Sequence, residues 1–256
     1  MSTLNYQYIK EMKYNLGTFG LIFILVLSIV NIQAQNKVPL TAKEILIKSI
    51  KKHDPNGNWH KLEARFNMKI ERSNQPTRLF YVSLNNKKGH FIYGVNSDTA
   101  TFSQSFSPPD VFSYQLNGST NISPDSLNKY GLTNTRTIYL KEVYEYLFGL
   151  PMRLTYDKQF MSQVVGDTIY NDAATHILHF NYIDKGSSET WKFFINKSSY
   201  QLEGYQFYKG DITKDGEWIT LKDYTEIKGI LMPKTKEWYW NKDNSYFRTD
   251  KIIDSY

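Results

Sequence analysis

Histidine is the side chain best suited to bind a metal ion or to transfer protons near neutral pH, and this chain has 5 of them. His176 and His179 form an H-x-x-H pair, a spacing that could hold a metal on one face of a helix. The pair lies in "THILHFNYI", which has the apolar pattern of a β-strand, where residues three apart point to opposite faces. His53, His60 and His90 have no motif around them, and we interpret them as helix-end, turn or strand residues. We therefore expect no metal site at the histidines.

The segment "DITKDGEW", Asp211–Trp218, resembles the first half of a calcium-binding loop. It has oxygen-bearing side chains at the first, third and fifth positions of such a loop and glycine at the sixth. The carboxylate that the loop needs at its twelfth position is replaced by Lys222. We therefore predict a hairpin turn here and no calcium site.

Motifs that would identify a hydrolase or a nucleotide-binding enzyme are missing from the sequence. There is no G-x-S-x-G elbow, no H-E-x-x-H pair and no glycine-rich phosphate loop. The aromatic segment "EWYWN", around Trp238–Trp240, could stack on sugars or bases, but Lys234 and Lys236 flank it and we interpret it as an edge strand. The sequence predicts a protein that is not an enzyme and has no cofactor, although carboxylates from distant strands could still converge in a cleft.

The composition of the chain excludes further kinds of functional site and partner. The chain has 256 residues and no cysteine, which excludes disulfides, thiol catalysis and thiolate metal sites. Its net charge of +6 is spread along the chain without a basic block, so we expect no binding to nucleic acid. The 20 tyrosines, 15 phenylalanines and 5 tryptophans have two explanations, large core side chains or the lining of a hydrophobic cleft. The first is the commoner reason, and composition alone leaves both open.

The beginning of the chain has the pattern of a secretory signal peptide. Lys13 precedes the apolar run Phe19–Val30, and Ala34 supplies a small residue at the expected cleavage point. The run is shorter than the roughly 20 apolar residues of a membrane span, which makes an uncleaved anchor the less favoured alternative. If translation began at Met12, residues 1–11 would be absent, and these residues are too polar to belong to a signal peptide.

The domain organisation follows from that signal. We expect residues 1–34 to be removed and residues 35–256 to form a single β-rich domain with no transmembrane segment. The mature protein is expected in the periplasm, with secretion or association with the outer membrane as alternatives.

Hydrophobic periodicity predicts one helix followed by a series of β-strands. Thr41 and Glu44 have capping-box spacing at the start of a helix that ends at "DPNGNW". From Leu62 to Ile70, apolar and polar residues alternate as in a strand with one buried face. Further short strands are separated by turn segments, which is typical of an antiparallel meander. The polar stretch Asn117–Asn134 is interpreted as a long surface loop.

A second helix is expected over residues 135–148, in the middle of the β-rich chain. Gly149 fits the left-handed cap position at its end, and Pro151 prevents its continuation. The helix is either the plug of a closed core or the lid of a hydrophobic cavity. Apolar side chains cover most of its circumference: Tyr139, Leu140, Val143, Tyr144, Tyr146, Leu147, Phe148 and Leu150.

Several strands after this helix are apolar on both faces. In "WKFFIN", Trp191, Phe193 and Ile195 lie on one side and Phe194 lies on the other. An antiparallel sheet with one wet face would alternate cleanly, so both faces must be covered. We expect helices over one face, and a second sheet or a ligand over the other.

The order of these segments resembles a family of uncharacterised exported proteins of Gram-negative bacteria, similar in layout to the outer-membrane lipoprotein carrier. The residues that carry the resemblance are His53–Trp59, Phe148–Leu154 and Leu202–Tyr208. It implies a mainly β fold with helices (α+β), an antiparallel incomplete β-barrel or strongly curved sheet whose concave side is closed by helices. Acyl chains would lie between the sheet and these helices. We find no match to the arginine that fixes the lid in the carriers, so lipoprotein transport is not implied.

This resemblance leads us to predict a non-catalytic periplasmic protein that binds a lipid or another hydrophobic small molecule and serves envelope maintenance. Envelope proteins are a further class of partner. Two alternatives remain, a structural or interaction module with a closed aromatic core and a hydrolase acting on the envelope. The residues expected to line the cavity are apolar or aromatic: Phe66, Met68, Tyr93, Tyr144, Phe148, Leu150, Met152, Trp191, Phe193, Tyr205, Phe207 and Trp218.

Overall fold

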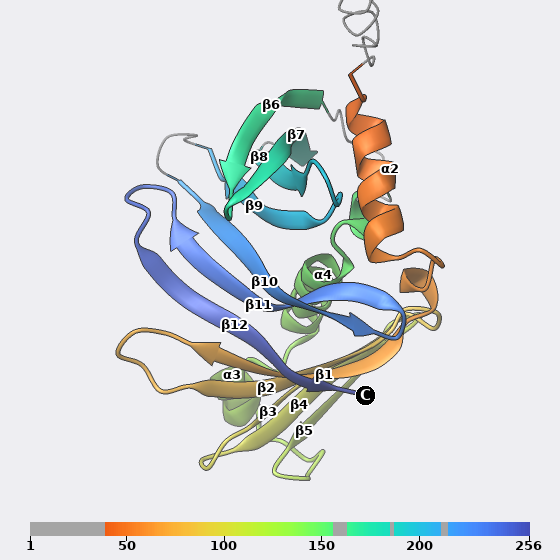
Figure 1. Ribbon diagram of the computed structural model, residues 1–256. Helices are drawn as coiled ribbons and strands as arrows, with labels where there is room; N and C mark the ends of the chain where they lie inside the picture. The colour runs from red at the N-terminus through yellow and green to blue at the C-terminus, as the bar shows by residue number, and fades with distance from the viewer. Residues whose placement is uncertain (1–38, 156–162, 185–186, 211–214) are drawn as a thin grey trace, which may run out of the picture. The chain divides into compact units, whose positions relative to one another are not determined.

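The alternating segments form one antiparallel sheet of 12 strands, in the order β5-β4-β3-β2-β1-β12-β11-β10-β9-β8-β7-β6 (Figure 1). The computed structural model describes residues 39–155, 163–184, 187–210 and 215–256. Two meanders, β1 to β5 and β6 to β12, are joined where β1 pairs with β12. The strands are β1 (Glu63–Glu71), β2 (Arg78–Asn85), β3 (His90–Asn96), β4 (Thr101–Ser107), β5 (Val111–Leu116), β6 (Gln163–Tyr170), β7 (Ala173–Asp184), β8 (Ser187–Asn196), β9 (Leu202–Tyr208), β10 (Glu217–Ile227), β11 (Ile230–Trp240) and β12 (Tyr246–Ser255).

The expected mainly β fold with helices is confirmed, and the sheet stays open because β5 and β6 lie at its two edges. The segment Thr41–Tyr256 forms one compact unit. The expected signal peptide, residues 1–34, lies outside the described residues, as does Asp211–Lys214 of the segment resembling a calcium loop. The helices of the described part are α2 (Ala42–His53), α3 (Pro124–Tyr130), α4 (Asn134–Gly149) and the short 3-10 helices η1 (Trp59–Lys61) and η2 (Met152–Thr155).

Contacts of α4 show that the sheet curves around this helix. The Phe148 ring stacks on Phe66 of β1, with ring centres 4.2 Å apart, and the Tyr146 ring meets Trp191 of β8 edge-on at 5.2 Å. β1 and β8 are five places apart in the sheet, which in a flat sheet would separate them by about 24 Å. A helix is only about 10–12 Å wide with its side chains, so the sheet must bend for α4 to reach both strands. We call the side that contacts α4 the concave face.

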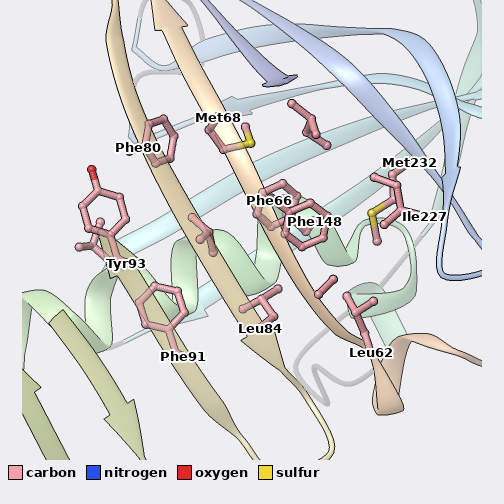
Figure 2. Close-up of a cluster of buried hydrophobic side chains, with 14 of the residues drawn as sticks. Leu62, Phe66, Met68, Phe80, Leu84, Phe91, Tyr93, Phe148, Ile227 and Met232 are labelled. Atoms are coloured by element: carbon pink, nitrogen blue, oxygen red, sulfur yellow. The ribbon is translucent and has the colours of Figure 1, made fainter. Parts of the chain in front are cut away.

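The strands of the first meander supply the largest share of one cluster of buried hydrophobic side chains. In β1 the buried and half-buried residues alternate as the sequence predicts, with Ala64, Phe66, Met68 and Ile70 buried. Side chains from β2 and β3 extend this layer, and Phe148 of α4 covers it (Figure 2). An antiparallel strand with one buried face needs this period of two, which is why the pattern was readable in the sequence.

Helix α2 begins as its sequence predicts and ends in a buried histidine. The Thr41 side chain accepts a hydrogen bond from the Glu44 amide, and the Glu44 carboxylate accepts one from the Thr41 amide. At the other end, His53 is fully buried and bridges two strands. Its Nδ1 lies 2.8 Å from the carbonyl oxygen of Leu231 in β11, and its Nε2 accepts a hydrogen bond from the amide of Leu202 in β9. The motif around His53 therefore anchors α2 to the sheet.

One local prediction was wrong. The stretch Asn117–Asn134 is not a continuous loop, because it contains helix α3. Ser123 caps this helix, Pro124 occupies its first turn, and Gly131 ends it with a left-handed backbone at φ 62°. The signals were present in "SPDS" and the following glycine, but the short helix has no buried residue and so no apolar period to reveal it.

The face of the sheet opposite α4 is covered around β8 and β10 by a side chain from the edge strand. Tyr170 of β6 stacks on Phe194, with ring centres 3.9 Å apart, and its hydroxyl donates to the carbonyl oxygen of Ile219. To reach Ile219, the Tyr170 side chain passes over Gly204 of β9. Glycine is needed at this position because a Cβ there would lie 2.3 Å from the Tyr170 ring. Both faces of β8 are thus covered at Phe193 and Phe194, and the cover at Phe194 is Tyr170, a side chain of the same sheet. In the described ranges, no helix has the length and apolar character needed to cross a bilayer.

Candidate functional site

The concave face has two aromatic halves, and the first lies under α4 across β1 to β3. Phe148 stacks on Phe66 (Figure 2). Tyr144 stacks on Tyr93 of β3, with ring centres 5.9 Å apart. Phe66, Met68 and Phe148 expose 0%, 3% and 3% of their surface, so the helix fills this half closely. The sequence predicted these five residues as cavity lining, and the structure brings them together in one packed layer.

The second aromatic half lies across β8 and β9. Trp191 stacks on Phe207 at 4.6 Å, and Phe193 and Tyr205 follow on the same face. Phe193, Tyr205 and Phe207 are buried, and Tyr146 of α4 meets Trp191 edge-on. Helix α4 therefore carries aromatic side chains into both halves of the face, Tyr144 and Phe148 into the first and Tyr146 into the second.

The end of α4 is fixed by a contact that the sequence did not reveal. Gly149 is the last residue of the helix and does not adopt the predicted left-handed conformation, which was a wrong interpretation. A Cβ at Gly149 would lie 2.5 Å from the indole of Trp59, so glycine is needed for close approach and not for a positive φ. Leu150 and Met152 follow in buried positions. Two of the three segments that carry the family resemblance, His53–Trp59 and Phe148–Leu154, therefore touch each other here.

Two predictions about tryptophans differ from the structure. Trp218 does not join the other predicted lining residues, because it lies on the opposite face of β10, stacked on Tyr239 at 4.2 Å. The segment Trp238–Trp240 was expected in an edge strand, but it belongs to β11, which is paired on both sides. Trp238 consequently faces the interior and is buried, in T-shaped contact with Tyr205. The histidines His176 and His179 lie in β7, where their spacing places them on opposite faces as predicted.

Charged side chains lie on the concave face between its two aromatic halves, with Lys236 and Asp250 buried and Arg248 half-buried. Lys236 of β11 is opposite Asp250 of β12, and they expose 3% and 6% of their surface. Arg248, two residues from Asp250, places its Nε 3.1 Å from the Asp250 carboxylate. The Arg248 guanidinium also lies over the Trp238 ring, 4.1 Å from its centre. Sequence reasoning missed this group because lysine and aspartate at alternating strand positions look like a solvent-facing edge.

Burial governs the ionisation of these groups. Burial lowers the pKa of Lys236 to about 8, although the Asp250 charge opposes that shift. Burial raises the pKa of Asp250, and the nearby Arg248 and Lys236 charges partly oppose it. Burial also raises the pKa of the Tyr205 and Tyr144 hydroxyls, which stay neutral. The site is therefore suited to hold an ionic or hydrogen-bonding group beside an apolar surface.

Solved structures with a similar fold include a domain from Vibrio parahaemolyticus that is provisionally identified as an outer membrane lipoprotein-sorting protein. It aligns with a TM-score of 0.50 and 12% sequence identity over 84% of this chain and 92% of that one. A DUF1329 family protein from Desulfovibrio piger aligns with a TM-score of 0.50 and 9% identity over 84% and 92% of the two chains. A LolA superfamily protein from Nitrosomonas europaea gives a TM-score of 0.49 and 13% identity over 85% and 93%.

At such low identities, the first two alignments show a shared fold, and the predicted similarity in layout to the lipoprotein carriers is confirmed. Comparison with curated protein sequences gives no match. A family model described as a family of unknown function, DUF6503, matches residues 19–255, and the chain therefore belongs to that family.

Proposed function

We propose that the protein binds a lipid or another hydrophobic small molecule on the concave face, beneath α4, and catalyses no reaction. One observation carries this proposal: a single helix lies across both aromatic halves of a strongly curved sheet. A ligand that separated α4 from the sheet would meet aromatic and aliphatic side chains from β1 to β9. Pockets for apolar ligands are lined in this way.

The energetics of such a site are favourable for an acyl chain. Each methylene group removed from water contributes about 0.8 kcal/mol, so a chain of a dozen carbons gives useful affinity without polar contacts. The cost is the displacement of α4, whose Phe148 and Tyr144 now occupy the first half of the face. The shared fold with a domain provisionally identified as a lipoprotein-sorting protein supports the same class of ligand. Because the sequence begins with the pattern of a signal peptide, we propose that the protein acts in the periplasm.

The proposed lining consists of eleven of the predicted residues, because Trp218 lies on the other face. They are Phe66, Met68, Tyr93, Tyr144, Phe148, Leu150, Met152, Trp191, Phe193, Tyr205 and Phe207.

Native mass spectrometry of protein purified without detergent tests this proposal, with lipid identified after organic extraction. We expect a bound lipid, and we expect the extracted protein to take up a fluorescent acyl-chain probe. The matched variants Trp191→Leu and Trp218→Leu remove one indole from each face of the sheet. The first should weaken probe binding and the second should leave it unchanged. A protein that carries no lipid and takes up no probe would contradict the proposal.

The second candidate is a structural or interaction module with a closed aromatic core. The close packing of α4 favours it, because Phe66 exposes 0% and Phe148 3% of their surface. On this alternative, α4 is a permanent plug, and neither extraction nor added lipid changes the protein. The same mass spectrometry experiment separates the two candidates.

A further inference from the structure

The buried charged group lies where β9, β11 and β12 pass beneath α4. Lys236 and Trp238 alternate along β11, and their partners across the ladder are Asp250 and Arg248. All four face the same side as Phe148, whose ring centre lies 5.2 Å from the Lys236 Nζ. The group therefore adjoins the proposed hydrophobic site and is not part of the solvent-facing surface.

Several polar atoms of this group are buried without an aligned hydrogen-bond partner among the residues that the structure describes. They are the hydroxyl of Tyr205, Nε1 of Trp238, Nε of Arg72, Nε of Arg248 and Oδ1 of Asp250. The Arg248 Nε lies 3.1 Å from the Asp250 Oδ1 in an ion pair, but the geometry is not that of an aligned hydrogen bond. The Trp238 side chain also lies close enough to Asp250 to lower the pKa of that carboxyl group, against the larger effect of burial, and its Nε1 is not aligned on the carboxylate either. Native proteins pair nearly all buried polar atoms, so a cluster of unpaired ones requires an explanation. A ligand with oxygen acceptors would provide the missing partners.

The balance of donors and charges indicates which ligand. Four of the five unpaired atoms are hydrogen-bond donors, and only the Asp250 oxygen is an acceptor. Lys236, Arg248 and Arg72 bring three positive charges near Asp250. Glu217 is half-buried, and although Arg248 opposes the effect, burial raises the pKa of its carboxyl group. Even with Glu217 ionised, cations exceed carboxylates, which favours an anionic oxygen group.

We propose that this cluster binds the anionic head group, a carboxylate or a phosphate, of an amphiphile whose acyl chain lies against the aromatic side chains of β8 and β9. Lys236 and Arg248 make the ionic contacts, and Tyr205 and Trp238 donate hydrogen bonds to the same oxygens. This inference rests on the proposed function, because it names the class of lipid that the hydrophobic site takes. Phe148 lies over Lys236 in this structure, so binding requires α4 to shift.

Paired probes with the same chain and different heads test the inference. The fluorescent fatty acid cis-parinaric acid and its methyl ester are titrated into full-chain protein freed of lipid by organic extraction. We expect the acid to bind at least tenfold more tightly than the ester. Lysophosphatidic acid and oleate, used as competitors, then show whether phosphate or carboxylate is preferred, and either preference supports an anionic head.

A variant without the Lys236 charge tests whether this residue causes the preference for the acid over the ester. Lys236→Met keeps the length of the side chain and removes its charge, and it should lower affinity for the acid about tenfold while leaving the ester unchanged. Lys222→Met is the matched control, because Lys222 is 42% exposed and pairs with Glu237 on the opposite face. If the single variant fails to fold, as near-ultraviolet circular dichroism would reveal, Lys236→Met with Asp250→Asn preserves charge balance and should give the same result.

The outcomes separate this inference from the proposed function. Equal binding of acid and ester, unaffected by the charge variants, would overturn the head-group site and leave the hydrophobic site standing. No binding of either probe would overturn both. Loss of acid preference in the Lys222→Met control as well would show that the charge effect is not specific to the concave face, and would also overturn the head-group site.

Discussion

His53 provides a direct test of how α2 is attached to the sheet. Its ring is fully buried between β9 and β11, with Nδ1 donating to the Leu231 carbonyl and Nε2 accepting from the Leu202 amide. A protonated ring has no acceptor nitrogen, so protonation would break the bond to Leu202. Burial lowers the pKa of His53 from 6.5 to about 4, although the hydrogen bond to Leu231 opposes this shift.

The sign and size of the pH effect follow from that shift. The folded pKa is lower than the unfolded pKa, so below about pH 6.5 the unfolded chain binds a proton that the folded chain refuses. The free energy of unfolding contributed by His53 is therefore complete above pH 6.5 and falls as the pH drops toward about 4. One pKa unit corresponds to about 1.4 kcal/mol, so the whole loss is about 3 kcal/mol.

Urea unfolding followed by tryptophan fluorescence measures this effect. Wild-type protein and a His53→Gln variant are unfolded at several values between pH 7.5 and pH 4. Because all other titrating groups are shared, the difference in unfolding free energy between the two proteins reports His53 alone. We expect the wild type to be the more stable at pH 7.5, and its advantage to shrink by about 3 kcal/mol toward pH 4. An advantage that does not change with pH would refute the role assigned to the buried ring.

Three further substitutions test the packing of the helices, each by the midpoint of urea unfolding. Phe148→Ala removes the ring that stacks on β1 and should cost about 3–5 kcal/mol of stability; a loss below about 1 kcal/mol would show that α4 is not firmly packed. Gly149→Ala should destabilise by about 1–3 kcal/mol, because the added Cβ would lie 2.5 Å from the Trp59 indole; a gain in stability from the better helix propensity of alanine would contradict that contact. Thr41→Ala removes the hydrogen bond to the Glu44 amide and should cost about 1 kcal/mol, and an unchanged midpoint would mean that the start of α2 frays in solution.

The sequence predicted the elements whose signals are local. The alternation in β1 and the capping box at Thr41 both depend on residues within a few positions of each other, and both are present as expected. Helix α4 was predicted within one residue at each end for the same reason. The short helix α3 was missed because it buries no side chain, and an apolar period was the signal that the other helices gave.

The features of the site that were missed depend on contacts between distant segments. Gly149 appeared to be a cap, and only the position of Trp59, ninety residues earlier, shows that it is a point of close approach. Lys236 appeared to be a surface residue, and only the pairing of β11 with β12 places it opposite Asp250 in the interior. A single sequence contains no information on which strands are neighbours, so buried charges on central strands cannot be recognised from it.

The two halves of the concave face differ, and the difference helps to decide whether α4 is the plug of a closed core or the lid of a binding site. Under Phe148 and Tyr144 the first half is apolar and closely packed, as a permanent core would be. The adjoining part contains the charged Lys236, and polar atoms of Arg248 and Asp250 there have no aligned hydrogen-bond partner among the described residues, which is costly in a core that never opens. A closed core would gain stability by replacing these residues with apolar ones of similar volume. Their presence beneath α4 is explained if the helix moves and a ligand completes their hydrogen bonds. The unpaired polar atoms, more than the aromatic content, therefore favour the interpretation of α4 as a lid.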